Sequence, residues 1–206
     1  MVKKKENKDP LMGYIEALHD INLYIPTRTI YFGGDTINED VVNPTTVAQA
    51  IKNLLVLEYQ DNTKPITLIL NSCGGSWFDG VGLYDIIKSL KSHVTIMAIG
   101  KVFSMGSIIL QAGDRRIITK HTFMMIHDGN DGYEGTPKSF EAWGENSKVT
   151  RLQCYKIYRE QMRKKNPKIT LKQIENLCSH DTIFDAEQCV EKGLADQIMD
   201  EMTKEA

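Results

Sequence analysis

The sequence has no apolar run that approaches the ~18 residues a membrane span requires, and no apolar segment follows the polar start MVKKKENKDP. We therefore expect neither membrane insertion nor secretion. Acidic and basic residues nearly balance, 27 against 25, so the net charge is only −2. This balance gives no reason to expect a nucleic acid or an anionic membrane as partner.

The sequence also lacks metal-binding cysteine motifs and a phosphate-binding loop. The four cysteines, Cys73, Cys154, Cys178 and Cys189, show no CxxC spacing and have no histidines at metal-ligand spacing, so no metal site is expected. They fit reduced thiols of a cytoplasmic protein. No GxxxxGK[ST] loop is present to cradle the phosphates of ATP.

The composition, 41% hydrophobic and 25% charged over 206 residues, fits one globular domain with a sizeable core. Residues 1–12 are polar and predict a flexible arm, which leaves 13–206 as the single domain. Apolar strands alternate with helices, which predicts an α/β protein. Strands are expected at 30–34, 66–72, 94–100, 115–120 and 122–128, and helices at 44–60, 77–90, 104–113, 138–165, 170–178 and 185–193.

Several helix ends carry clear signals. Asn43 and Pro44 predict a capped helix start, Thr170 with Gln173 a capping box, and Asp185 a further cap. The helix at 138–165 has an apolar stripe with spacings of three and four residues: Val149, Leu152, Tyr155, Tyr158 and Met162. Such a stripe usually packs in the core, and an oligomer contact is the second interpretation.

Three stretches place reactive groups at the ends of predicted elements. Ser104, in KVFSMGS, is by default a helix cap; as a nucleophile it would need the amides of Met105 and Gly106 to face a cleft. Gly74 and Gly75 form at least a turn with positive φ, and an exposed amide there could also donate to an oxyanion. Cys73 is a weaker candidate nucleophile because no base is adjacent.

His127 ends a predicted strand, and Asp181 lies in a loop between two helices. Each has a structural explanation when taken alone, as a satisfied histidine and as a turn or cap residue. Taken together with Ser104, they supply what acyl-bond hydrolysis requires. A serine needs a base to take its proton, a neutral histidine suits that role, and a carboxylate orients the imidazole.

From about Thr29 to the C-terminus, the sequence resembles the ClpP family, the proteolytic subunits of ATP-dependent Clp protease. The family's motifs occur in order as YFGGDTI, SCGGS, FSMGS, MIH and HDTIFDAEQCVEKGLAD. The resemblance implies that Ser104 is the nucleophile of a serine endopeptidase, His127 the general base and Asp181 its orienting carboxylate. It further implies an oxyanion hole formed by the backbone N–H groups of Gly75 and Met105.

The same resemblance implies an α/β fold, a ClpP/crotonase-like spiral of β-β-α units. A protruding handle at about 129–165 would combine the long helix with a preceding strand. Family members form stacked heptameric rings around a chamber that admits unfolded polypeptides, so the stripe from Val149 to Met162 would be an interface. A Clp-type AAA+ unfoldase feeds the chamber, so ATP would be used by that partner and this chain would need no cofactor. The expected role is cytoplasmic protein quality control.

The sequence departs from the family's pattern at several positions. Cys73 replaces a proline, HDGN replaces His-Gln-Pro, and His180 stands where the family usually has an arginine. Two alternatives therefore stay open: a catalytically weak scaffold subunit, and a protease of phage head maturation. An acyl-CoA hydratase of the same fold would need paired carboxylates near the glycines. A membrane-bound signal-peptide-degrading protease would need an apolar anchor, and neither feature is found.

Overall fold

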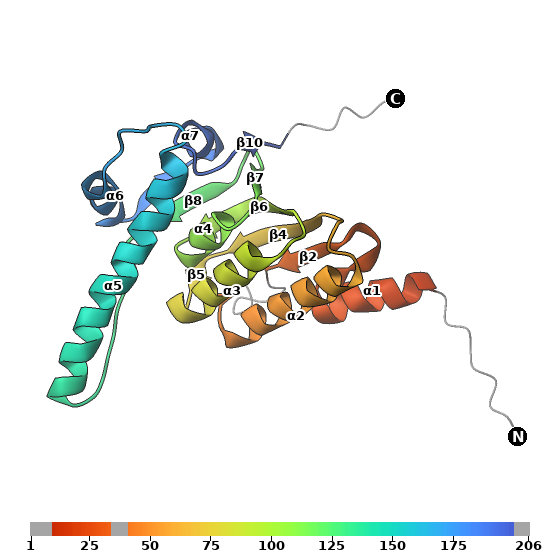
Figure 1. Cartoon of the computed structure of the whole chain (residues 1–206), viewed down its shortest axis with the longest axis horizontal. Helices are drawn as coiled ribbons and strands as arrows, with labels where there is room; N and C mark the ends of the chain where they lie inside the picture. Colours follow the sequence, from red (N-terminus) through yellow and green to blue (C-terminus); the bar gives the residue numbers. More distant parts are fainter. Residues whose placement is uncertain (1–9, 34–40, 200–206) are drawn as a thin grey trace, which may run out of the picture.

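The structure is a computed structural model and describes residues 10–33 and 41–199. Helices cover a central sheet, and one long helix projects from this body (Figure 1). The first half of the chain forms α1 (Pro10–Ile21), β1 (Leu23–Tyr24), η1 (Ile25–Thr27), β2 (Thr29–Phe32), β3 (Val41–Val42), α2 (Pro44–Gln60), β4 (Ile66–Ser72), β5 (Gly74–Gly75) and α3 (Trp77–Ser89). The second half forms β6 (Val94–Phe103), α4 (Met105–Leu110), β7 (Arg115–Ile118), β8 (Phe123–Ile126), α5 (Pro137–Met162), α6 (Leu171–Cys178), β9 (Thr182–Phe184), α7 (Ala186–Glu191) and β10 (Gln197–Ile198).

The large sheet is mostly parallel, in the order β1-β2-β4-β6-β7-β10. Strand β6 is shared between two partners: Thr95–Ala98 pair with β7, and Lys101–Phe103 pair with β8. A second, small sheet pairs β3 with β5 in parallel. The units β2-β3-α2, β4-β5-α3 and β7-β8-α5 each contribute two strands and a helix, and in the unit between them the long strand β6 leads directly into α4. This arrangement confirms the α/β fold of the ClpP/crotonase type expected from the sequence.

Apolar burial explains the strand assignments. Strand β4 alternates buried and half-buried residues, with Ile66, Leu68 and Leu70 fully buried. Helix α4 is buried at every position from Met105 to Leu110, so it forms the centre of the core under β6. Burial of this kind supplies the main favourable free energy of folding, about 25 cal/mol per Å² of apolar surface.

The capping signals are confirmed. The Asn43 side chain accepts hydrogen bonds from the N–H groups of Thr45 and Thr46, and the Asn43 N–H donates to the Thr46 hydroxyl oxygen. Thr170 with Gln173 and Asp185 with Gln188 form the same reciprocal arrangement at α6 and α7. These contacts satisfy N–H groups that have no acceptor within the first helical turn.

Helix α5 projects beyond the sheet, and its buried residues all lie in its second half (Figure 1). Tyr155, Tyr158 and Met162 are buried there, whereas Val149 and Leu152 remain 53% and 41% exposed. The expectation of one continuous interface stripe is therefore wrong for Tyr155, Tyr158 and Met162, which are core residues of their own chain. The stripe divides because each step of three residues turns by about 60° around the helix, so Val149 and Leu152 face away from the side that carries Tyr158.

The segment before α5 also differs from expectation. A strand was implied ahead of the long helix, but the described residues 129–136 have no β structure. A strand needs a neighbour to accept and donate its backbone hydrogen bonds, and this segment lies where the sheet of its own chain has ended. We call α5 together with 129–136 the handle.

The described chain begins with a helix that was not among the elements expected from the sequence. Of the arm predicted over 1–12, residues 1–9 lie outside the described residues, and Pro10–Met12 form the start of α1. Helix α1 has no buried residue, and it leaves Leu11, Met12 and Ile15 exposed. It lies beside α2 at the end of the body away from α5 (Figure 1).

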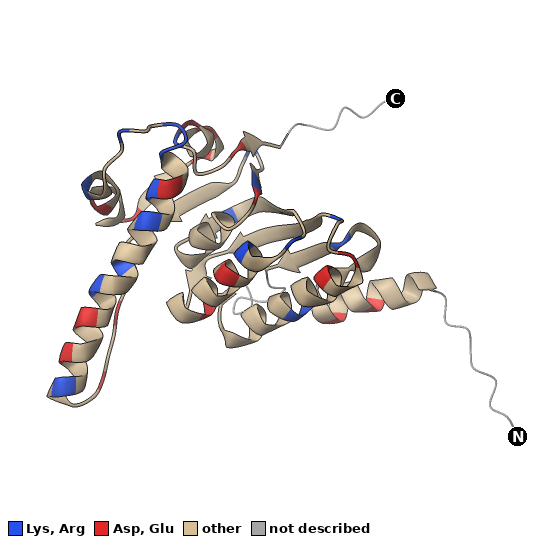
Figure 2. Cartoon of the chain, in the orientation of Figure 1, with Lys and Arg blue, Asp and Glu red and all other residues tan. Residues whose placement is uncertain are grey.

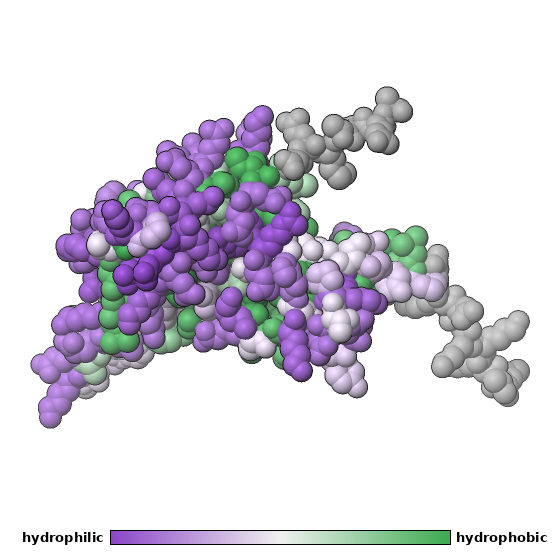
Figure 3. All heavy atoms as spheres, turned by 45° about the horizontal axis from the view of Figure 1, so that its top comes forward, coloured by the Kyte–Doolittle hydropathy of each residue, from purple (hydrophilic) through white to green (hydrophobic). Residues whose placement is uncertain are grey.

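The surface mixes charges of both signs. Lys and Arg occur together with Asp and Glu along α5 and over the helices that cover the sheet (Figure 2). The face in Figure 3 is largely hydrophilic, with apolar residues in separate patches. Across 10–33 and 41–199, no helix is long and apolar enough to cross a membrane.

Candidate active site

Ser104 lies in the turn between β6 and α4, and its backbone adopts φ 51° and ψ −121°. Positive φ is unusual for a residue with a side chain and typically costs about 1–3 kcal/mol. Ser104 occupies the N-cap position of α4, yet its side chain makes no capping hydrogen bond. The helix-cap explanation therefore describes its position but not what its hydroxyl does.

Hydrogen bonds on both sides hold this strained turn. The Ser104 N–H donates to the Met125 carbonyl at 2.8 Å, which ties the turn to β8. The Ser104 carbonyl accepts from the N–H and the hydroxyl of Ser107, at 2.9 Å and 2.6 Å. Because the one hydroxyl proton of Ser107 is used there, the buried Tyr158 hydroxyl donates to Ser107 Oγ, at 2.6 Å. Through Tyr158, the long helix α5 thus helps to hold the turn in place.

Strand pairing brings the other two candidate residues to Ser104. His127 directly follows β8, which runs parallel to the end of β6. Asp181 directly precedes β9, whose antiparallel pairing with β8 sets Thr182 opposite Ile126. One step further along this register, His127 and Asp181 face each other. The structure therefore places the three residues named from the sequence in one group.

The hydrogen bonds within this group form an unbroken chain. His127 Nε2 lies 2.7 Å from Ser104 Oγ, and His127 Nδ1 lies 3.0 Å from Asp181 Oδ1. A carboxylate only accepts, so the imidazole proton is on Nδ1 and donates to Asp181. In a neutral ring Nε2 is then free to accept from the Ser104 hydroxyl. The His127 side chain is 20% exposed and that of Asp181 68% exposed.

The two glycines have the positive φ that the turn interpretation predicted, 97° at Gly74 and 144° at Gly75. The Ser76 N–H donates to the Val42 carbonyl of β3 at 2.8 Å. Gly75 itself lines the cleft together with Ser104 and Met105. Met105 is the first residue of α4, so its N–H has no acceptor within the helix.

These groups line a common cleft of about 420 Å³. Its wall includes Gly75, Ser104, Met105 and His127, with Ile108, Cys154 and Tyr158 deeper in the body. The residues after His127 are fixed at the rim, because the Tyr155 hydroxyl donates to Asp128 Oδ1 at 2.6 Å. Burial and this hydrogen bond raise the pKa of Tyr155 well above its usual value, so the hydroxyl stays protonated and remains a donor.

The cysteines do not match the requirements of a nucleophile. Cys154 is the one that lines the cleft among the described residues, and its hydrogen bond with Cys178 and its burial raise the pKa of its thiol. Thiolate, the reactive form, is therefore scarce. Cys73 is exposed and is not part of the cleft wall described above. In the same described part of the chain, no cluster of His, Cys, Asp and Glu is suited to a metal ion.

Two comparisons with known proteins bear on the whole chain. A family model described as Clp protease matches residues 18–202. The chain is also 30% identical, over 188 residues, to a protein of Salinibacter ruber named ATP-dependent Clp protease proteolytic subunit 1. The aligned region covers 90% of this chain and 76% of that protein.

Proposed function

This chain belongs to the Clp protease family, and we propose that it is a serine endopeptidase that hydrolyses peptide bonds of unfolded polypeptides. The observation that carries the proposal is the hydrogen-bond chain from Ser104 through His127 to Asp181, at 2.7 and 3.0 Å. The alternative of a catalytically weak scaffold subunit is less well supported, because such a subunit has no need of this arrangement.

In the proposed mechanism, His127 Nε2 takes the Ser104 proton as Ser104 Oγ attacks the carbonyl carbon of the scissile peptide bond. The carbonyl oxygen gains a negative charge, which the N–H groups of Gly75 and Met105 stabilise. The C–N bond then breaks, and the imidazolium returns its proton to the leaving amine. A water molecule, deprotonated by His127, attacks the acyl ester in the same way and releases Ser104.

Asp181 acts through the imidazole. Its carboxylate keeps the proton on Nδ1 and stabilises the imidazolium that forms in each step. Its high exposure weakens this effect, because water also solvates the carboxylate.

We further propose a cytoplasmic homo-oligomer of stacked heptameric rings, served by a Clp-type AAA+ unfoldase that consumes the ATP. The exposed apolar residues Val149 and Leu152 on the handle support assembly, because water is excluded from such side chains in an interface. Native mass spectrometry tests the rings: Leu152→Asp should shift the mass toward smaller species. A control at an exposed residue of α2, Tyr59→Ala, should leave the mass unchanged.

The catalytic assignment is tested with a fluorophosphonate probe and a fluorogenic peptide. Wild type should be labelled, and Ser104→Ala should lose labelling and cleavage, about 10⁶-fold in kcat. Asp181→Asn should lower kcat by about 10²–10⁴-fold because it favours the wrong imidazole tautomer. Ser89→Ala, at an exposed serine of α3, should behave as wild type. Labelling that persists in Ser104→Ala would exclude Ser104 as the nucleophile.

A further inference from the structure

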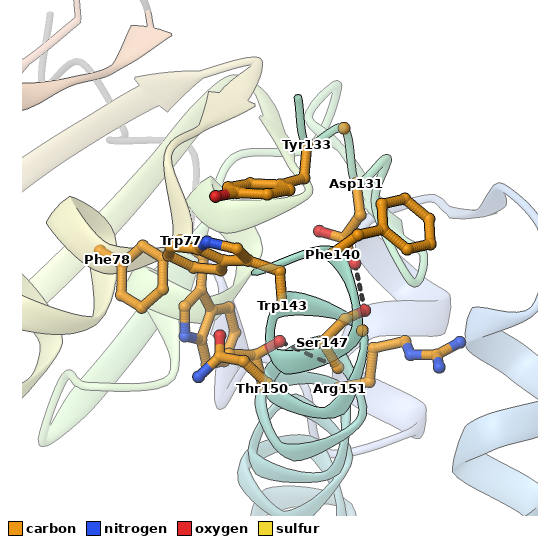
Figure 4. Close-up of a pocket in the computed structure, with 12 residues that line it drawn as sticks. Trp77, Phe78, Asp131, Tyr133, Phe140, Trp143, Ser147, Thr150 and Arg151 are labelled. Atoms are coloured by element: carbon orange, nitrogen blue, oxygen red, sulfur yellow. Dashed lines mark hydrogen bonds between the residues drawn. The ribbon is translucent and has the colours of Figure 1, made fainter. Parts of the chain in front are cut away.

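A second pocket adjoins the catalytic cleft and is walled by aromatic rings. We call it the aromatic pocket; it has a volume of about 360 Å³, and its rings are those of Trp77, Phe78, Tyr133, Phe140 and Trp143. Figure 4 shows the rings of Trp77, Phe78, Tyr133 and Trp143 gathered together, whereas the ring of Phe140 points away from them beside Asp131. Pockets that hold a ligand side chain are typically concave and apolar, and they usually have ~300 Å³ or more.

The aromatic pocket is continuous with the cleft. The two share Trp77 and Phe78 at the start of α3, Asp131 and Gly132 in the handle, and Thr150 and Arg151 on α5. The deeper wall of the cleft, formed by Ile108, Cys154 and Tyr158, does not belong to the aromatic pocket. A polypeptide seated at Ser104 therefore meets two separate recesses along one path.

Trp143 is the central ring of the wall. Its ring lies edge-on to Phe78, with centroids 6.1 Å apart, and at a tilt of 32° to Tyr133, with centroids 5.4 Å apart. These contacts connect three elements: α5, the start of α3 and the segment that follows His127. All three rings nevertheless keep large exposed fractions, 44% for Trp143, 57% for Phe78 and 40% for Tyr133.

The pocket lies on the inward side of the handle. At about 100° per residue, Phe140 and Trp143 fall within about 60° of Tyr158, which is 1% exposed and packs on the body. Val149 and Leu152 fall about 120–180° away, on the opposite side of α5. The surface proposed for assembly is thus a different face of the helix, which favours substrate over a second copy as the occupant of the pocket.

The carboxylate beside the rings is already engaged, and the guanidinium of Arg151 lies near a second carboxylate while its buried Nε has no hydrogen-bond partner among the described residues. Asp131 accepts a hydrogen bond from the Ser147 hydroxyl, and Arg151 lies 3.9 Å from Asp128. The remaining wall offers exposed apolar faces, and covering them with an apolar group removes that surface from water. The chemistry therefore matches an aromatic or large aliphatic side chain.

We infer that the aromatic pocket is a specificity subsite, which binds an aromatic or large aliphatic side chain of the substrate polypeptide. The inference rests on the proposed peptidase function. In an extended peptide, alternate side chains point to the same side at intervals of about 6.5–7 Å. One side chain next to the scissile bond can thus enter the cleft while another enters the aromatic pocket.

The first measurement uses binding without turnover. The chain has two tryptophans, Trp77 and Trp143, and both line the aromatic pocket, so tryptophan emission reports on it directly. Ser104→Ala is titrated with peptides that carry phenylalanine or alanine at each position in turn. Phenylalanine at one position should change the emission and tighten binding about 10- to 100-fold over alanine.

The second measurement is the ratio of kcat/KM for the phenylalanine and alanine peptides in the active enzyme. Wild type and the distant control Tyr59→Ala should show the same preference, about 10- to 100-fold. Trp143→Ala should remove most of it. So should Phe140→Ala, whose ring is 62% exposed and whose replacement disturbs no core packing.

The possible outcomes separate the two proposals. Absence of labelling at Ser104 in wild type refutes the peptidase function. The titration of Ser104→Ala still measures whether peptides bind in the aromatic pocket. An undiminished preference in Trp143→Ala and Phe140→Ala, or no preference in wild type, refutes the subsite. Loss of the oligomer in both pocket variants also refutes it, because the pocket would then hold a second copy of the chain.

Discussion

The geometry of Ser104 depends on the absence of a side chain at Gly74, and Gly74→Ala tests this dependence. Gly74 is buried with φ 97°. A Cβ atom there would lie 2.7 Å from Ser104 Cβ, 2.8 Å from the Phe103 carbonyl oxygen and 3.1 Å from the Met105 nitrogen. Backbone atoms and a Cβ make up this contact, so no flexible side chain can move aside.

The magnitude follows from these distances. Carbon atoms in contact are usually about 3.5–4.0 Å apart, so Ser104 must move by roughly 1 Å relative to Gly74. A displacement of ~1 Å in a reacting group costs about 10²-fold in rate. The positive φ adds about 1–3 kcal/mol of strain and the overpacking a similar amount. For a chain of this size, a loss of about 2–5 kcal/mol lowers the Tm by roughly 5–15 °C.

The assay compares kcat, KM and Tm of Gly74→Ala with those of wild type and of Gly82→Ala. Gly82 lies within α3, where an added Cβ meets nothing within 4 Å. Gly82→Ala should therefore leave kcat unchanged and stabilise the protein by about 0.5–1 kcal/mol through helix propensity. If folded Gly74→Ala keeps the wild-type kcat and labels Ser104 at the wild-type rate, the close approach of Gly74 does not position the nucleophile.

Two further predictions concern cysteine reactivity and stability at low pH. A maleimide should modify the exposed Cys73 in the native protein and reach the buried Cys154, Cys178 and Cys189 only after unfolding. Burial also raises the pKa of the Cys189 thiol to about 12, so its reactive thiolate is scarce. Intact mass counts the adducts, and more than one adduct on the native protein would contradict this burial. Arg116 is 1% exposed and pairs with Asp196; burial acts to raise the pKa of Asp196, but the hydrogen bonds and charge of Arg116 prevail and lower it. The ion pair therefore stabilises the folded protein fully above the pKa of about 3.9 that Asp196 has in the unfolded chain. This stabilisation is lost as the pH falls through the lower pKa that Asp196 has in the folded protein. Asp196→Asn should lower the free energy of unfolding by about 2–3 kcal/mol at pH 7, which is less than for a fully buried pair because the Asp196 side chain is 38% exposed. Urea unfolding should show that the difference between variant and wild type shrinks below about pH 4. A difference independent of pH would refute an ionic role.

The sequence alone was sufficient to predict most elements and the capping residues. The capping boxes at Asn43, Thr170 and Asp185 involve partners three residues away, so local patterns contain the whole interaction. The buried strand β4 was equally clear, because both faces of a covered sheet require apolar residues. Helix α1 was missed although Leu11, Ile15 and Leu18 recur at helical spacing, because the polar residues before it were extended into one predicted arm; these three apolar residues are exposed in the structure.

The long helix shows the limit of periodic patterns. The stripe from Val149 to Met162 is spaced by three and four residues, yet Tyr158 is buried and Val149 is exposed. Repeated steps of three residues turn around the helix, so Val149 and Tyr158 face opposite sides. Which side is buried depends on the packing of α5 against the rest of the chain. The aromatic pocket has the same origin, since Trp77 and Trp143 come from separate helices and no motif connects them.

By itself, then, the sequence determined the order of strands and helices, the glycine turn and the identity of the three candidate residues, because these depend on neighbouring side chains or on recognisable motifs. Only the tertiary structure decided that Ser104, His127 and Asp181 meet, since 23 and 54 residues separate the hydrogen-bonded pairs. Parallel pairing of β6 with β8 and antiparallel pairing of β8 with β9 bring them together. Such long-range pairing is fixed by burial of the whole sheet and not by the local sequence around any one residue.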